Sequence, residues 1–238
     1  MNSTLTIRTD FTVDLVQAQA NDDSVMWAAK ISTLGERSQL RVAEDFKNRT
    51  FLIRYLMKNR HGTPFEHNLM TFYVEAPIFV FREMMRHRIG ISYNEESARY
   101  KELSPVFYVP GFNRPLVQTG KTGYYKHEAG SEELTYLATS KLGEAYAVAY
   151  RCYQDMIAEG VTREVARSCL PVGTYVSAYV TMNARSLMHF LSLRTEGSAV
   201  PSHPQWEIAQ VAAQMEAHWC ELMPVTAEAF DLAERMAP

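Results

Sequence analysis

Four arginines, one histidine and three carboxylates are concentrated between Arg82 and Tyr100, where the sequence reads REMMRHRIGISYNEESARY. Helical geometry over residues 81–87 would place a polar, mostly cationic face opposite Met84 and Met85. That face consists of Arg82, Glu83, Arg86 and His87. Arginine binds phosphate and carboxylate groups through two parallel hydrogen bonds, so this face indicates a nucleotide site. The alternative is a solvated helix end stabilised by salt bridges.

Polar residues continue after Gly90, where the helix is expected to break. Ile91 and Tyr93 alternate with polar positions, which predicts a short strand or extended loop. Its polar side chains are Ser92, Asn94, Glu95, Ser97 and Arg99. Hydroxyl groups and a carboxylate beside arginines can bind a ribose, which agrees with a nucleotide site.

Length and composition are those of an ordinary globular protein. The 238 residues are 47% hydrophobic, and no repeat or linker divides them, so we expect a single α+β domain over residues 1–238. The net charge of −3 argues against a nucleic-acid binder and favours a small anionic partner. No apolar run reaches the ~18 residues of a membrane span. The N-terminus lacks the apolar core of a signal peptide, so we expect a cytoplasmic protein without a membrane partner.

The three cysteines, Cys152, Cys169 and Cys220, are far apart and form no C-x-x-C pair. Neither a disulfide framework nor a zinc knuckle is indicated, and each cysteine is expected to be a small buried residue. Cys169 lies beside arginines in ARSCLP and is the one candidate for a nucleophile.

The motif HGTPFEH at residues 61–67 is typical of a helix start. Thr63 can be the N-cap, Pro64 suits the first helical position, and Glu66 can complete a capping box. The two histidines are not explained in this way. A metal site from His61, Glu66 and His67 is the alternative, but the spacing matches no established zinc pattern, so we predict none.

Periodicity and capping signals place the remaining elements. Strands are predicted over 11–17, 68–75 and 172–181, and helices over 22–32, 44–60, 131–159, 162–170, 183–194, 205–222 and 226–235. The 22–32 helix should be capped by Asp22, Asp23 and Ser24. Residues 105–130 are rich in Pro, Gly, Asn and Tyr, which predicts a long surface loop that could lie over a site.

The predicted helix over 183–194 carries polar residues on two sides. Asn183 and Arg194 project within about 20° of each other, whereas Arg185 and His189 project on nearly the opposite side. One pocket could not easily use both pairs. Either one pair is structural, or the helix lies between two sites of different subunits, which favours a symmetric oligomer.

The motifs RHR at 86–88 and SYNEESARY are preceded by HGTPFEH and followed by NARSLMHFLSLR and QWEI. This ordered set closely resembles the flavin-dependent thymidylate synthases, from AAKIS at 28–32 to Glu207. The resemblance implies a homotetramer of mixed helices with a central antiparallel sheet and FAD between subunits. It also implies reductive methylation of dUMP to dTMP, with 5,10-methylenetetrahydrofolate as one-carbon donor and NADPH as reductant.

The resemblance further implies roles for individual residues. Those carried over as FAD contacts are Thr63, Arg86, His87, Arg88, Glu95, Asn183, Arg185 and His189, with Ser32 as a weaker candidate. Those carried over as dUMP contacts are Glu83, Arg86, Glu95, Ser97, Arg99, Arg167 and Arg194. Arg194 would face the uracil ring as the catalytic arginine, and no cysteine would serve as nucleophile.

Two other classes of function are compatible with parts of the sequence. An RNA-binding module could use the arginines with Tyr93 and Tyr100 as stacking partners, but the acidic pI of about 6.2 argues against it. A metal hydrolase would require the histidines to converge. Of these three classes, only a flavoprotein would be yellow when purified.

Overall fold

The computed structural model describes residues 4–35, 46–122 and 124–238. The chain groups into two compact units that alternate along the sequence. The first unit contains residues 1–12, 75–84 and 95–178, and the second contains residues 13–74, 85–94 and 179–238. Most boundaries between the units fall inside strands rather than in linkers. The single domain expected from the sequence therefore stays a prediction.

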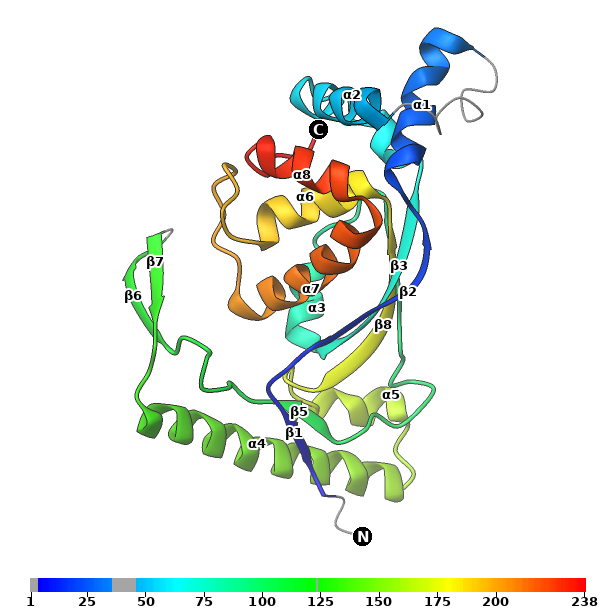
Figure 1. The fold of residues 1–238 in the computed structure, drawn as a ribbon. Helices are drawn as coiled ribbons and strands as arrows, with labels where there is room; N and C mark the ends of the chain where they lie inside the picture. The colour runs from blue at the N-terminus through cyan, green and yellow to red at the C-terminus, as the bar shows by residue number, and fades with distance from the viewer. Residues whose placement is uncertain (1–3, 36–45, 123) are drawn as a thin grey trace. The chain divides into compact units, whose positions relative to one another are not determined.

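A four-stranded antiparallel sheet has the strand order β2 (Thr12–Gln19), β3 (Leu69–Pro77), β8 (Tyr175–Met182) and β4 (Ile91–Glu95) (Figure 1). In β3 the residues from Met70 to Ala76 alternate between buried and partly exposed positions. This alternation is the two-residue period of a strand with one covered face. The predicted α+β class is confirmed.

Two further strand pairs lie in the first unit. β1 (Thr6–Arg8) runs parallel to β5 (Val106–Tyr108), and β6 (Val117–Lys121) pairs antiparallel with β7 (Tyr124–Glu128). The prediction of an irregular loop over 105–130 was therefore wrong. Every residue of β7 is exposed, so the sequence carries no hydrophobic alternation there that would reveal the strand.

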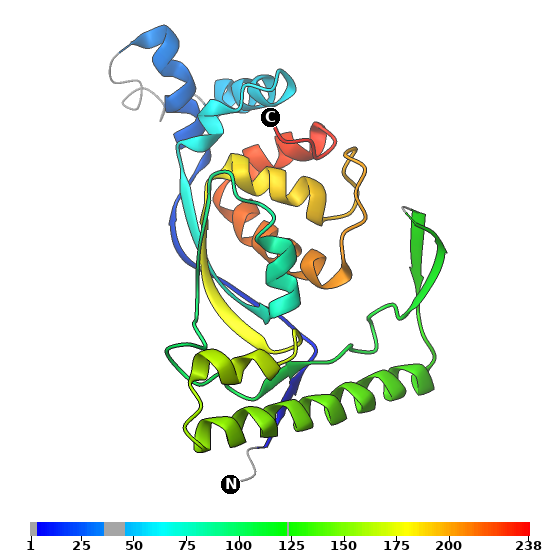
Figure 2. The same ribbon diagram turned by 180° about the vertical axis from the view of Figure 1, so that it is seen from behind.

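The longest helix of the first unit is α4 (Glu132–Ala158), capped by the Ser131 hydroxyl, which accepts from the Leu134 N–H as predicted. Its buried tyrosines pack on β5, where the Phe107 and Tyr146 rings stack at 4.8 Å. α5 (Arg163–Ala166) continues as the 3-10 helix η3 (Arg167–Cys169) beside α4 (Figure 2). The predicted helix over 162–170 is thus two short pieces, and Thr162 gives it no side-chain cap.

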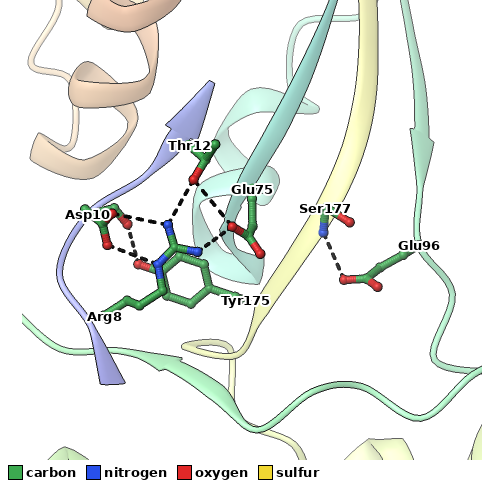
Figure 3. Close-up of polar contacts among 7 residues, drawn as sticks. All are labelled: Arg8, Asp10, Thr12, Glu75, Glu96, Tyr175 and Ser177. Atoms are coloured by element: carbon green, nitrogen blue, oxygen red, sulfur yellow. Dashed lines mark hydrogen bonds and ion pairs between the residues drawn. The ribbon is translucent and has the colours of Figure 1, made fainter. Parts of the chain in front are cut away.

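Arg8 is the centre of a polar network in the first unit (Figure 3). Its guanidinium donates to Asp10 and to the Thr12 hydroxyl, each at 3.0 Å, and also to Glu75. It lies 4.7 Å from the centre of the Tyr175 ring, whose hydroxyl donates to the Asp10 carbonyl at 2.6 Å. The bond from Arg8 lowers the pKa of Asp10, and burial raises the pKa of Tyr175. The network fastens the N-terminal segment to β3 and β8.

The helices of the second unit are α1 (Asp22–Leu34), α2 (Phe46–Lys58), α6 (Ala184–Arg194), α7 (Trp206–Leu222) and α8 (Pro224–Leu232). Both views show α6, α7 and α8 packed together (Figures 1 and 2). Asn21, rather than the predicted residues 22–24, caps α1. Asp22 is instead buried and accepts from the Val225 and Thr226 N–H groups at the start of α8. Residues 44 and 45 of the predicted second helix lie outside the described residues.

The central helix α3 (Ile78–Met84) ends earlier than predicted. Arg86 and His87, expected on its polar face, lie instead in the turn that leads to β4. In this segment the carbonyls of His87 and Ile89 accept hydrogen bonds from the Tyr93 and Ser186 hydroxyls. No helix in the described ranges is long and apolar enough to cross a membrane.

Candidate active site

The loop formed by residues 86–90 is fixed to its surroundings at three points. The Tyr93 hydroxyl donates to the His87 carbonyl at 2.9 Å, and the Ser186 hydroxyl donates to the Ile89 carbonyl at 3.0 Å. Gly90 has φ of 68°, and a Cβ on it would lie 2.3 Å from the Ser186 Oγ. Glycine is therefore required here both for the left-handed backbone and for the close approach to α6.

The third anchor joins the His87 ring to the end of α6. Arg194 Nε donates to His87 Nε2 at 3.0 Å, and the imidazole meets the edge of the Phe190 ring at 5.0 Å between centres. Because a guanidinium has no acceptor, His87 Nε2 must offer its lone pair. This contact selects a neutral imidazole with its proton on Nδ1.

A cavity of about 570 Å³ opens beside this loop, within the range of small-molecule sites. Its lining consists of Glu66, residues 86–91, Asn183, Arg185, Ser186 and His189. In the described part of the chain, the Arg86 and Arg88 guanidiniums make no hydrogen bond or ion pair. Two cations without partners in one cavity form a site for an anionic group.

Arg185 is held on the opposite side of the same cavity. Its Nε donates to the Pro238 carbonyl at 2.8 Å, and its Nη1 pairs with Glu66. Gly62 allows this arrangement, since a Cβ there would lie 2.4 Å from the Arg185 Nε. The capping box predicted for HGTPFEH was wrong. Residues Thr63–Glu66 form the short 3-10 helix η2 without a side-chain cap, and Glu66 binds Arg185 instead.

Asn183, Arg185 and His189 line one cavity, so their predicted division between two opposed faces was wrong. Asn183 precedes the helix as its N-cap, with φ of −90° and ψ of 171°, so the helical angle does not apply to it. Its side-chain oxygen accepts from the Ser186 N–H at 2.8 Å. Partial burial and the nearby Arg185 lower the pKa of His189, which favours a neutral imidazole at pH 7.

Five further candidates belong to the first unit. Burial and the adjacent Glu96 raise the pKa of Glu95, while Arg167 opposes the shift. Glu96 itself accepts from the Ser177 N–H at 3.0 Å, which fixes the chain next to Glu95 (Figure 3). In the same group, the Arg99 N–H donates to the Ser97 hydroxyl at 3.3 Å, and the Arg99 guanidinium pairs with Glu164 at 3.0 Å.

Comparison with known proteins identifies the family of this chain. The family described as thymidylate synthase complementing protein matches residues 14–225. The chain belongs to this family. It is 55% identical to the flavin-dependent thymidylate synthase of Streptomyces avermitilis, over 97% of this chain and 95% of the relative. The family protein of Streptomyces coelicolor with the same name is also 55% identical, over 98% of this chain and 95% of its own.

Solved structures show the same fold at similar identity. The UMP/dUMP methylase PolB from Streptomyces cacaoi, bound with 5-Br dUMP, superposes with a TM-score of 0.93 at 50% identity, covering 98% of this chain and 100% of that chain. Its structure with 5-Br UMP gives a TM-score of 0.91 at 49% identity, covering 98% of this chain and 99% of that chain.

The structure gathers most, but not all, of the FAD candidates drawn from the family resemblance. The cavity contains Arg86, His87, Arg88, Asn183, Arg185 and His189, while Thr63 lies outside its described lining. Arg194 reaches this group through His87. Five candidates belong to the first unit, namely Glu83, Glu95, Ser97, Arg99 and Arg167. Their roles remain predictions.

Three residues that support the cavity were not identified from the sequence. Tyr93 and Ser186 hold the loop, and Glu66 holds Arg185. Tyr93 could have been inferred from its alternation with Ile91, which indicates an inward side chain. The partners of Ser186 and Glu66 are distant in sequence, so no local pattern reveals them.

Neither a metal nor a thiolate site is apparent among the described residues. No group of three or more His, Cys, Asp or Glu side chains is placed to hold a metal ion in that part of the chain. The Cys169 thiol contacts the carbonyls of Ala166 at 3.2 Å and Ala149 at 3.5 Å, and burial raises its pKa. Both effects favour the protonated thiol, which is the weaker nucleophile.

Proposed function

We propose that this chain catalyses the reductive methylation of dUMP to dTMP, with 5,10-methylenetetrahydrofolate as one-carbon donor, NADPH as reductant and FAD as cofactor. The observation that carries this proposal is the cavity at residues 86–91 and α6, where Arg86 and Arg88 lack partners in the described part of the chain. Relatives at 55% identity that are named flavin-dependent thymidylate synthases give it further support.

The reaction balances with these reactants. The transferred methylene carbon must gain two electrons to become a methyl group, and NADPH with one proton supplies them. The products are dTMP, tetrahydrofolate and NADP⁺. Bound FAD would accept the hydride from NADPH and supply it for the methylation of dUMP. No cysteine is assigned as nucleophile, since Cys169 is held as a thiol.

The residues of the cavity fit the anionic part of FAD. Arg86 and Arg88 can each present two donors to a diphosphate, in charge-assisted hydrogen bonds. His87, Asn183, Arg185 and His189 complete this site, with Thr63 and Glu95 as further contacts. Neutral His87 and His189 would donate or accept single hydrogen bonds without adding charge.

For dUMP, we assign Arg194 to the uracil ring. Adding a hydride or a carbon to the ring places negative charge on its N3 and carbonyl side. A guanidinium directed at that edge would stabilise the anionic ring more than the neutral one, which accelerates the reaction. The remaining contacts in this proposal are Glu83, Arg86, Glu95, Ser97, Arg99 and Arg167. The Arg99–Glu164 pair has half-exposed partners, so a phosphate can replace the carboxylate.

The proposed assembly is a cytoplasmic homotetramer with FAD at subunit interfaces. Flavin content and assembly should therefore be coupled. Light scattering gives the mass of the purified protein, and flavin absorbance recorded on the same sample should belong to a species with the mass of a tetramer. A flavin-loaded monomer would contradict the proposed assembly.

The central test is an absorbance spectrum followed by an assay of dTMP formation. The purified protein should be yellow, and Arg88→Ala should be largely colourless because it loses charge-assisted bonds to a buried diphosphate. Arg151→Ala is the matched control, since this exposed arginine lies on α4 and is not among the residues that line the cavity. A colourless wild-type protein that forms no dTMP when supplied with FAD, NADPH, folate donor and dUMP would refute the proposal.

A second candidate substrate is UMP. The relative PolB, named a UMP/dUMP methylase, is described with both 5-Br UMP and 5-Br dUMP. The two 55% identical relatives carry the thymidylate synthase name, which favours dUMP for this chain. Parallel assays with UMP and dUMP at equal concentrations discriminate them, because a UMP methylase would form 5-methyl-UMP at a comparable rate.

A further inference from the structure

A second cavity, of about 470 Å³, lies between α2 and α8 in the second unit. Its lining combines apolar and charged side chains. The apolar group includes Met57, Leu232 and Met236, and the charged group is Arg54, Lys58, Arg60 and Glu234. None of these residues was assigned to the FAD or dUMP site.

Two helix ends place charged side chains at this cavity in an unusual backbone conformation. At the end of α2, the Arg60 N–H donates to the Met57 carbonyl at 3.1 Å, and the His61 N–H donates to the Leu56 carbonyl at 2.9 Å. Glycine usually occupies the left-handed position of such a turn. Here that position is Arg60, with φ of 55°.

The end of α8 repeats this arrangement. The Glu234 N–H donates to the Asp231 carbonyl, and the Arg235 N–H donates to the Phe230 carbonyl, each at 2.9 Å. Glu234 occupies the equivalent left-handed position with φ of 55°, and the next residue, Arg235, also has φ of 55°. Glycine would suit positions 60 and 234 with less strain, yet Arg60 and Glu234 carry charged side chains that line the cavity.

The charges of this cavity are only partly paired. Arg54 pairs with Glu228 at 2.7 Å. In the described ranges, Lys58 has no hydrogen bond or ion pair, and the Arg60 guanidinium donates to the Met236 sulfur at 3.5 Å. A thioether sulfur is a weak acceptor. Lys58 and Arg60 can therefore bind an anion without first losing a carboxylate.

We propose that this cavity binds the 2′-phosphoadenosine end of NADPH. The 2′-phosphate would accept from Arg60 and Lys58, as arginine accommodates this group in other NADP sites. The adenine ring would pack on Met57, Leu232 and Met236, and the Glu234 carboxylate would accept from a ribose hydroxyl or the adenine amine. The inference rests on the proposed function, in which NADPH is the reductant.

The C-terminal segment connects this cavity with the proposed FAD site. Met236 lines the cavity, and the carbonyl of Pro238, two residues later, accepts from Arg185 in the wall of the other cavity. Both cavities belong to the second unit. A dinucleotide bound by its adenosine end at Arg60 can therefore extend along residues 236–238 toward the flavin.

Cations at a helix C-terminus also offset the helix dipole, which is an ordinary reason for Lys58 and Arg60 at the end of α2. The two explanations differ in what Arg60→Gly does. Glycine relieves the left-handed strain, so this variant should fold at least as well as the wild type. If Arg60 only offsets the dipole, ligand binding will not change.

The test uses the FAD-loaded enzyme and 2′,5′-ADP as the probe, with binding measured by calorimetry. Arg60→Gly and Lys58→Ala should each weaken 2′,5′-ADP binding by on the order of tenfold. In the same variants the KM for NADPH should rise and the preference for NADPH over NADH should fall. The KM values for dUMP and for methylenetetrahydrofolate should not change, and Arg151→Ala should bind the probe like the wild type.

Two outcomes would overturn this inference. One is unchanged 2′,5′-ADP affinity in both variants. The other is loss of FAD from Arg60→Gly together with equal affinity for 5′-ADP and 2′,5′-ADP, which would assign the cavity to the adenine half of FAD.

Reduction of the flavin by dithionite separates the inference from the proposed function. Dithionite replaces NADPH, so the Arg60→Gly enzyme should then form dTMP at the wild-type rate. A wild-type enzyme that forms no dTMP under these conditions would refute the proposed function, whereas probe binding at Arg60 is measured independently of turnover.

Discussion

Arg194, the last residue of α6, donates from Nε to His87 Nε2 at 3.0 Å, which joins the proposed catalytic arginine to the centre of the RHR motif. The contact connects residues 107 positions apart in sequence. It holds the guanidinium beside the proposed flavin cavity before any substrate binds. A guanidinium oriented in advance in this way would meet the uracil edge with little loss of side-chain entropy.

Arg194→Ala should retain its fold and its flavin but lose dTMP formation by on the order of a hundredfold or more, as expected when an electrostatic stabiliser of the transition state is removed. Arg194→Lys should recover only part of this loss, because an ammonium lacks the planar pair of donors. Steady-state assays and the flavin spectrum measure both effects. If Arg194 merely interacts with the helix dipole, stability changes by only about 0.3–1 kcal/mol and turnover is normal.

Gly90→Ala should lose flavin and stability because the new methyl group meets the Ser186 hydroxyl and the backbone has a positive φ. Gly35→Ala is a matched control, since Gly35 has φ of 69° and no atom of the described residues lies within 4 Å of its added Cβ. The control should show only the left-handed penalty, about 1–2 kcal/mol. Chemical denaturation of Gly90→Ala, Ser186→Ala and the double variant Gly90→Ala/Ser186→Ala gives the interaction energy between the two positions. Equal losses of stability in Gly90→Ala and Gly35→Ala would contradict a steric role for Ser186.

Glu95 should lower the stability of the folded chain as the pH rises, which is opposite to the usual effect of a carboxylate. Burial and Glu96 raise its pKa above the usual 4.5, so folding favours its protonated form. Its unfavourable effect on stability is absent below the usual pKa and develops as pH rises through the raised value. Glu95→Gln should therefore melt at a slightly higher temperature than the wild type at pH 7, and the difference should vanish near pH 4. Thermal melts of the flavin-free protein across this range test the sign. Arg167→Ala should raise the pKa of Glu95 further, since Arg167 opposes the shift.

Cys169→Ala should bind flavin and form dTMP within a few-fold of the wild-type rate, because its thiol bonds to main-chain carbonyls and its pKa is raised. Turnover assays with flavin content measured on the same sample decide this. A loss of more than about a thousandfold with flavin still bound would favour covalent catalysis through this thiol.

The features predicted best from the sequence are those that depend on interactions between residues close together in the chain. The cap at Ser131 and the lengths of α4 and α6 follow from residues within one helical turn. The helical angle assigned to Asn183 failed because a capping residue is not helical. The pair of Glu66 with Arg185 spans 119 residues, so only tertiary structure brings it together. β7 was missed because both of its faces are exposed.

The network around Arg8 also bears on how the chain folds during synthesis. The Tyr175 hydroxyl and the Asp10 carbonyl that it binds are 165 residues apart, and β1 pairs with β5 about 100 residues later in the chain. Contacts of such long sequence separation form slowly. β1 leaves the ribosome before its partners in β5 and β8, which are translated much later. Until then the residues of β1 cannot form their native pairing, and such incompletely folded chains are prone to aggregation.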